Sequence, residues 1–350
     1  MEYSKIAGIE KPVSRIVFGC GGARMWAGEE SSDVLDAAVE AGITAFDTAR
    51  VYGKSEEALG KWLYSRGRSG VFVITKGCHP LEDWVPRVGG KYIEEDLFRS
   101  LDALKTDYVD LYFLHRDDET VPVGEILEAL NAQAEAGRIR AFGASNWTHA
   151  RLQEANEYAE AHGLRPFSAS SPYFGLAVQL AAPVQGCLSI AGKENAAARA
   201  WYRAEQFPLF AYSSLAGGFL SGRVKAEQGA AAIIAAAGPV YGCADNAERL
   251  ARAEKLAAIK GCTVAQVALG WVFAQGLNIF ALASASTPER VFANAQPAVL
   301  TQAEADYLDL KAPNWRAKVK NGRGKSDFNL HFARIVVQWR GNSFIRKSGL

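Results

Sequence analysis

Four side chains that can move protons follow three apolar segments of this sequence. Asp47 ends the run ITAFD at 43–47, and Tyr52 lies in the short VYGK segment after it. Lys76 comes directly after VFVIT at 71–75, and His115 ends YVDLYFLH at 108–115. Each of these residues alone is more often a solvated strand end or a structural residue. An acid, a phenol, an amine and an imidazole at three successive junctions are a stronger pattern, because these junctions can converge on one point.

The chemistry that these groups can share is proton delivery to an oxygen that becomes an alkoxide. A phenol has a pKa of about 10, so Tyr52 is protonated at neutral pH. It is a weak acid unless a nearby cation lowers that pKa, and Lys76 could be that cation, held in place by Asp47. His115 could donate a hydrogen bond to the same oxygen. A carbonyl oxygen needs such a proton when the carbonyl carbon receives a hydride.

Short β-branched and aromatic runs alternate with longer amphipathic stretches over most of the chain. Near-continuous apolar strands alternating with helices indicate a parallel sheet covered by helices. Eight such units in about 300 residues fit a (β/α)8 TIM barrel, which collects its chemistry at the C-terminal ends of the strands. An open doubly wound sheet is the alternative. The predicted strands are residues 15–19, 43–47, 71–75, 108–115, 138–145, 166–170, 208–213 and 278–284.

Helical patterns follow these strands. They span residues 31–41, 55–66, 91–105, 123–136, 148–162, 193–206, 246–260, 263–275, 288–295 and 301–309. Residues 1–14 precede the first strand, and we expect them to plug the lower end of the barrel. Residues 220–245 are expected to form a long loop with a helical piece.

Composition excludes several classes of protein. The chain has 350 residues, 49% of them hydrophobic, which suffices for one large domain or two ordinary ones. No run of about 18 apolar residues predicts a membrane span. The five cysteines are scattered and form no C-x-x-C pair, which favours free thiols in a reducing, cytoplasmic compartment over disulfides or a metal site. Nine Lys/Arg and one Asp fall within 313–350, so only this basic tail could contact nucleic acid.

The segments FDTARVYGKSEEALG, VITKG, DLYFLHRDD and GRIRAFGASNW closely resemble signature segments of the aldo-keto reductases, particularly the bacterial aryl-alcohol-dehydrogenase-like members. The resemblance covers residues 1–312. It implies the same barrel, a general acid/base role for Tyr52 with Lys76, Asp47 and His115 around it, and a nicotinamide dinucleotide bound without a Rossmann domain. The motif GCGGAR at 19–24 agrees with the last point, since Arg24 replaces the final glycine of the Rossmann fingerprint.

The resemblance also implies a set of cofactor-binding residues. The pair that hydrogen-bonds the nicotinamide carboxamide is matched by Ser145 and Asn146, and the aromatic residue that stacks on the nicotinamide by Tyr212. The pyrophosphate loop is matched by Ser213, Leu215 and Gly217. The adenosine end is matched by Ser284, Ser286, Arg290 and Asn294. Ser170 is a further candidate cofactor-binding residue, and it replaces a glutamine that many members carry at the end of the sixth strand. Ser284 replaces a frequent lysine and Ala293 a frequent glutamate. Arg290 favours NADP(H), because a guanidinium can pair with a 2′-phosphate, and NAD(H) remains the alternative.

Three tryptophans, Trp26, Trp84 and Trp147, fall in loops after predicted strands and are candidate substrate-binding residues. They indicate a hydrophobic or aromatic small-molecule carbonyl substrate, although a sugar can also stack on tryptophan and such residues often serve packing alone. His79 is interpreted as structural or as a surface residue. The sequence indicates neither the identity of the substrate, nor the physiological direction, nor the oligomeric state.

Two functions remain open at this point. The first is an NADP(H)-dependent carbonyl reductase. The second is a non-catalytic, nucleotide-binding regulatory subunit, because the aldo-keto reductase family includes channel-associated members of that kind. The basic tail, residues 313–350, does not resemble the usual end of the family. We expect it to be disordered or to arise from a frameshift or read-through, with a functional basic arm as the alternative.

Overall fold

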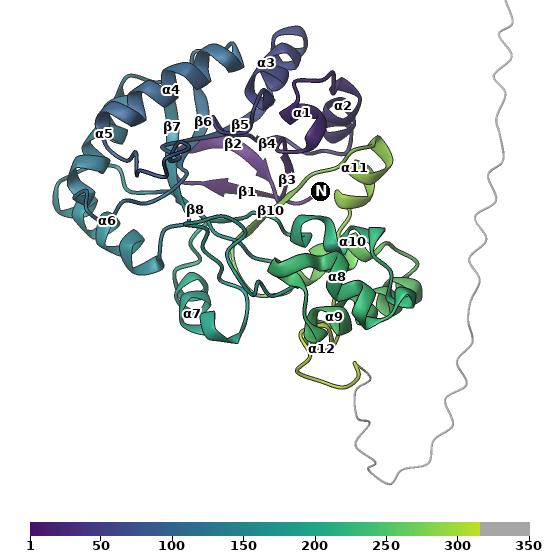
Figure 1. Ribbon diagram of the computed structural model, residues 1–350. Helices are drawn as coiled ribbons and strands as arrows, with labels where there is room; N and C mark the ends of the chain where they lie inside the picture. The colour runs from purple at the N-terminus through teal and green to yellow at the C-terminus, as the bar shows by residue number, and fades with distance from the viewer. Residues whose placement is uncertain (316–350) are drawn as a thin grey trace, which may run out of the picture. The chain divides into compact units, whose positions relative to one another are not determined.

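The computed structural model describes residues 1–315 and contains a closed parallel barrel of eight strands in the order β10-β3-β4-β5-β6-β7-β8-β9 (Figure 1). Each strand pairs in parallel with its neighbours, and β10 closes the ring against β3. The predicted (β/α)8 barrel is therefore confirmed, and the open doubly wound sheet is wrong. The barrel strands are β3 (Ile16–Gly19), β4 (Ala45–Asp47), β5 (Phe72–Gly77), β6 (Val109–Leu114), β7 (Ile139–Ser145), β8 (Ala169–Ser171), β9 (Leu209–Ala211) and β10 (Ile279–Ala283).

Helices follow the strands and cover the outside of the barrel (Figure 1). They are α1 (Ala23–Trp26), α2 (Ser32–Glu40), α3 (Ser55–Arg66), α4 (Gly90–Leu104), α5 (Val123–Glu135), α6 (His149–Ala161), α7 (Ala196–Glu205), α8 (Ala230–Tyr241), α9 (Ala244–Lys260), α10 (Val264–Phe273), α11 (Pro288–Asn294) and α12 (Gln302–Leu308). The short α1 was not predicted. The expected helical piece within 220–245 is α8, whose backbone is interrupted at Gly238, just before Pro239.

The first residues form an antiparallel hairpin of β1 (Tyr3–Ile6) and β2 (Ile9–Ser14), which closes the N-terminal end of the barrel. Ile6, Ile9 and Val13 are buried together with the inward-facing residues of the barrel strands. The Lys11 ammonium donates to the carbonyl of Val71, just before β5. The predicted plug is confirmed, and the opposite end of the barrel is left to carry the site.

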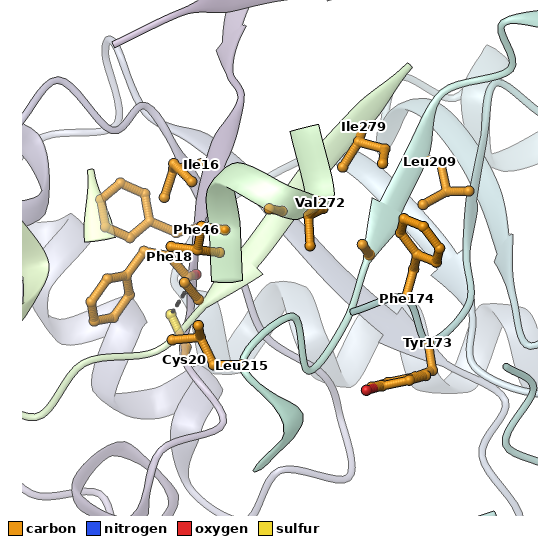
Figure 2. Packing of buried hydrophobic residues seen from close by; sticks show 14 of the residues in the cluster. Ile16, Phe18, Cys20, Phe46, Tyr173, Phe174, Leu209, Leu215, Val272 and Ile279 are labelled. Carbon is orange, nitrogen blue, oxygen red and sulfur yellow. Dashed lines mark hydrogen bonds between the residues drawn. The ribbon is translucent and has the colours of Figure 1, made fainter. Parts of the chain in front are cut away.

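The side chains of the barrel strands alternate between two apolar layers, one inside the barrel and one between the barrel and the helices. Inside the barrel, the rings of Phe210 and Phe280 stack with centroids 4.6 Å apart. Outside it, Leu209 and Ile279 belong to the layer that packs against the helices, together with Val272 of α10 (Figure 2). Because successive side chains of a strand point to opposite faces, neighbouring residues such as Leu209 and Phe210 serve different layers.

The compact unit ends at Trp315, whose ring lies against that of Tyr307 with centroids 4.6 Å apart. The remainder of the basic tail, and with it the expectation of disorder or artefact, lies outside the described residues.

Gly60 lets α3 approach the C-terminal end of α4 closely. A methyl group at this position would clash with the Ala103 carbonyl and the Leu104 backbone. We expect Gly60→Ala to lower the free energy of unfolding by about 1–3 kcal/mol, since backbone cannot yield as a flexible side chain can. Gly90→Ala is the matched control, because a methyl there makes only an ordinary contact with Ala129. Urea unfolding of both variants tests this, and equal stability of the two would contradict it.

Candidate active site

The four predicted catalytic residues lie at the C-terminal ends of three adjacent strands. Asp47 is the last residue of β4, Lys76 lies near the end of β5, and His115 directly follows β6. Tyr52 lies in the turn between β4 and α3. The structure brings these side chains together, because the neighbouring strands β4, β5 and β6 are paired in register and end at one rim.

Lys76 and Asp47 form a buried ion pair beneath this rim. The Lys76 ammonium donates to both carboxylate oxygens of Asp47, each at 2.6 Å, and to the carbonyl oxygen of Thr48 at 2.9 Å. Burial lowers the pKa of Lys76, but the carboxylate of Asp47 and the phenol of Tyr52 more than offset this, and the pKa is raised overall. Burial raises the pKa of Asp47, against the opposing effect of Lys76. The short bidentate contact supports a charged pair.

Tyr52 is enclosed by side chains from the C-terminal ends of three neighbouring parts of the barrel: Trp26 after β3, Lys76 in β5 and His115 after β6. Its ring stacks on Trp26 with centroids 5.7 Å apart, and it meets His115 edge-on, also at 5.7 Å. The Lys76 ammonium lies 5.1 Å from the centroid of the phenol ring. Burial raises the pKa of Tyr52, and Lys76 only partly counteracts this. Lys76 acts on this pKa in the expected, lowering direction, but the loss of solvation outweighs it, so the pKa is raised overall.

His115 is held in its neutral form. Burial, followed by the charges of Lys76 and Arg116, holds its pKa well below the usual range. Its Nδ1 atom is buried and has no hydrogen-bond partner among residues 1–315. A neutral imidazole has one N–H to donate, so His115 can hydrogen-bond an uncharged carbonyl oxygen without competing for the proton.

Asn146 is fully engaged within the protein. Its amide nitrogen donates to the His115 carbonyl and to Ser145 Oγ, both at 3.1 Å. Its amide oxygen accepts from the Leu188 N–H and from the Tyr212 hydroxyl, both at 2.9 Å. An amide offers two donors and two acceptor sites, so Asn146 could contact a ligand only by giving up one of these bonds. The predicted contact with a nicotinamide carboxamide stays a prediction, as does that of Ser145, whose hydroxyl donates to the Ser171 carbonyl.

Two predicted residues point away from the site. The Ser170 hydroxyl shares a 2.7 Å hydrogen bond with Tyr202 of α7 and is fully buried in the layer between barrel and helices. Its neighbours Ala169 and Ser171 face the other way along the strand. Trp147 is also fully buried, against Phe167. The cofactor assignment of Ser170 and the substrate assignment of Trp147 are wrong for this reason.

The other two candidate substrate-binding tryptophans, Trp26 and Trp84, lie at the barrel mouth. Trp26 is 47% exposed while its ring covers Tyr52. Trp84, in the loop after β5, meets His79 edge-on with centroids 5.6 Å apart. His79 in turn lies 4.9 Å from His115, so this half-buried residue packs against the site, and its interpretation as structural or as a surface residue stays a prediction. The place of His79 three residues after Lys76, in the loop of a site-bearing strand, was the available signal for this contact.

The remaining predicted cofactor residues fall into two groups. The segment after β9 contains Tyr212 and three residues of the expected pyrophosphate loop, Ser213, Leu215 and Gly217, in a backbone with repeated positive φ angles. Around the start of α11, Ser284, Ser286 and Arg290 are exposed, and Asn294 is buried. Ser284 Oγ donates to the Gly19 carbonyl at 2.7 Å, which joins β10 to β3. Arg290 forms no ion pair among residues 1–315, so its guanidinium is available to a ligand.

Within residues 1–315 no cluster of three or more His, Cys, Asp or Glu side chains could hold a metal ion. No single described helix is long and apolar enough to cross a membrane. The α9–α10 pair meets that length and composition only jointly, across a bend of 102°.

Comparison with known proteins agrees with this geometry. A model of the Aldo/keto reductase family matches residues 15–312. This chain belongs to that family. It is 36% identical over 179 residues to an aldo-keto reductase of Bacillus subtilis, a match that covers 47% of this chain and 53% of the relative. An aldo-keto reductase of Schizosaccharomyces pombe, whose name specifies NADP(+), is 29% identical to this chain, over 76% of this chain and 78% of its own length.

A solved structure supports the fold independently. The crystal structure of a thermostable aldo-keto reductase in complex with the inhibitor epalrestat superposes with a TM-score of 0.65, covering 89% of this chain and all of the other. At 22% sequence identity this likeness concerns the barrel and not the substrate. Membership of this family supports an oxidoreductase activity for this chain.

Proposed function

We propose that this aldo-keto reductase reduces an aldehyde or ketone to an alcohol with NADP(H), and that Tyr52 is the general acid. The observation that carries the proposal is the convergence of Tyr52, neutral His115 and the Lys76–Asp47 ion pair at one rim of the barrel. A bound nicotinamide dinucleotide would supply the hydride, and Tyr212, the Ser213–Gly217 segment and the start of α11 are the residues that would hold it.

In the proposed mechanism His115 donates its N–H to the carbonyl oxygen and orients it toward Tyr52. As negative charge develops on that oxygen, the Tyr52 hydroxyl gives up its proton. The raised pKa of Tyr52 keeps the phenol protonated until this moment. The Lys76 ammonium then stabilises the phenolate, and Asp47 holds the ammonium in position.

Absorbance of NADPH, followed with a panel of aldehydes and ketones, tests the proposal directly. Consumption of NADPH that depends on the carbonyl compound is expected. If the protein binds NADPH but turns over none of the panel, the alternative of a non-catalytic regulatory subunit becomes the better account. We also propose a cytoplasmic location, since all five cysteines are free and two of them are buried.

Arg290 is proposed to select NADP(H) over NAD(H) through the 2′-phosphate. Charge-assisted hydrogen bonds are worth roughly 1.5–3 kcal/mol, so Arg290→Ala should weaken NADPH binding about tenfold to hundredfold and leave NADH binding nearly unchanged. Quenching of tryptophan fluorescence, titrated with both dinucleotides, measures this. Equal weakening of both, or equal affinity of the unaltered protein for both, would refute the assignment.

A further inference from the structure

Arg116 is a buried cation without an acidic partner. Only 7% of the residue is exposed, and no carboxylate lies within 4.0 Å of its guanidinium among residues 1–315. Its hydrogen bonds are to neutral acceptors: Nη1 donates to the His115 carbonyl at 2.8 Å, Nε to the Gln185 carbonyl at 3.2 Å, and Nη2 to Cys187 Sγ at 3.4 Å. The adjacent Asp117 lies instead 3.5 Å from Arg151.

The guanidinium stands beside the groups of the active site. Arg116 follows His115 at the end of β6, and its charge contributes to the lowered pKa values of His115 and His79. It reaches the 185–187 segment, and the next residue, Leu188, accepts from the Tyr212 hydroxyl at 3.2 Å. Arg116 therefore links the end of β6, which carries His115, to the loop after β8.

The position of Arg116 argues against a phosphate of the dinucleotide as the anion that it would bind. In the closed strand order, β6 lies opposite β10. The segment after β10 carries Ser284 and, with α11, Arg290, which are the proposed adenosine-end residues. Arg116 is thus on the other side of the barrel from the proposed 2′-phosphate site.

The chemistry of Arg116 fits a carboxylate. A buried charge that lacks a partner is unfavourable, and an anion supplied by a ligand would offset this cost. A guanidinium has five N–H groups, of which three are used here, leaving one on Nη1 and one on Nη2. Two N–H groups in one plane match the two oxygens of a carboxylate. Lys76 and Arg87 are already paired, with Asp47 and Asp96, whereas Arg116 forms no ion pair among residues 1–315.

We propose that Arg116 determines substrate class: the carbonyl substrate carries a carboxylate, which the guanidinium binds while Tyr52 and His115 act on the carbonyl oxygen. This inference rests on the proposed reductase function and narrows it from carbonyl compounds in general to oxo acids. Aromatic surface at the mouth, supplied by Trp26 and Trp84, would pack against the body of such a substrate. The competing account is that Arg116 only anchors the 185–187 segment.

Matched substrates separate the two accounts. We would measure kcat and KM for 4-carboxybenzaldehyde and for its methyl ester, using the unaltered enzyme, Arg116→Met and Arg116→Lys. Arg203→Met is the control, because this arginine contacts a backbone carbonyl at the surface. The unaltered enzyme should prefer the carboxylate about tenfold or more. Arg116→Met should raise KM for the carboxylate about tenfold to hundredfold and leave the ester unaffected, as expected for loss of a charge-assisted contact.

Arg116→Lys should retain part of the preference, because it keeps the charge but not the planar fork. Equal losses for acid and ester, or no preference in the unaltered enzyme, would overturn the inference. Tryptophan quenching by 4-carboxybenzyl alcohol provides a readout without turnover. If no carbonyl compound is reduced, the proposed function fails, whereas Arg116-dependent binding of the carboxylate still decides the inference. Should Arg116→Met fail to fold, the Lys variant and this binding measurement give the answer.

Discussion

Replacing Tyr52 with phenylalanine is expected to lower kcat for carbonyl reduction by about 10²–10⁴, the usual contribution of a positioned proton donor. The substitution removes one oxygen and keeps the ring that packs between Trp26 and His115. Affinity for NADPH should therefore stay nearly unchanged. Steady-state kinetics with the best aldehyde of the panel, together with an NADPH titration, measure both quantities.

Tyr64→Phe is the matched control for this experiment, because the Tyr64 side chain lies on α3 and is 79% exposed. It should retain the activity of the unaltered enzyme. Comparing the two directions of the reaction provides a further test. Reduction needs the protonated phenol of Tyr52, and oxidation needs its phenolate. Since burial raises the pKa of Tyr52, reduction should stay constant through neutral pH while alcohol oxidation rises into the alkaline range. Normal turnover by Tyr52→Phe would remove this residue from the mechanism.

The barrel itself could be predicted from the sequence, because each strand is a short run of β-branched and aromatic residues followed by a helical pattern. The pattern of residues 55–66 predicted α3 with its observed bounds, because acidic residues stand in the first turn and the apolar residues lie on one face of the helix. The hairpin β1–β2 was expected only as a plug. Its segments YSKI and IEKPVS mix charged and apolar residues, because only one side of this hairpin faces the barrel interior.

The catalytic residues were predictable for a similar reason: a residue that ends a barrel strand is placed at the rim by the strand. The roles of residues that lie one position away from such a strand end were not predictable in this way. Ser170 and Ser171 are both serines, and which of them faces outward depends on the register of β8 and on its partner Tyr202 in α7. Trp147 follows Asn146, whose left-handed backbone, with φ of 63°, precedes the buried indole.

Charge partners were the least predictable feature. Arg116 precedes Asp117 and Asp118 in the sequence but forms an ion pair with neither. In the structure Asp117 turns to Arg151 of α6, and burial raises its pKa to about 6. Whether a charge is paired depends on contacts between distant segments, which residue types alone do not specify.

Lys76→Met is expected to be the most destabilising single change in the site. It leaves the Asp47 carboxylate buried with no cation beside it, and breaking a buried ion pair in this way typically costs about 3–5 kcal/mol. Without Lys76 the pKa of Asp47 should rise further above its unfolded value. A carboxyl whose folded pKa is raised loses stability as the pH rises, so the deficit should be larger at alkaline pH than at acidic pH.

The double variant Asp47→Leu/Lys76→Met separates this structural effect from the catalytic one. Apolar residues of similar size often replace a buried ion pair without loss, so the double variant should recover most of the free energy of unfolding. It should not recover activity, because no ammonium remains to stabilise the Tyr52 phenolate. In the single variant Lys76→Met, the residual alcohol oxidation should lose the limb of its pH profile that is assigned to Tyr52. Urea unfolding at two pH values and the pH dependence of oxidation provide both readouts. An active, stable double variant would show that Lys76 is a structural residue and that Tyr52 works without a cation.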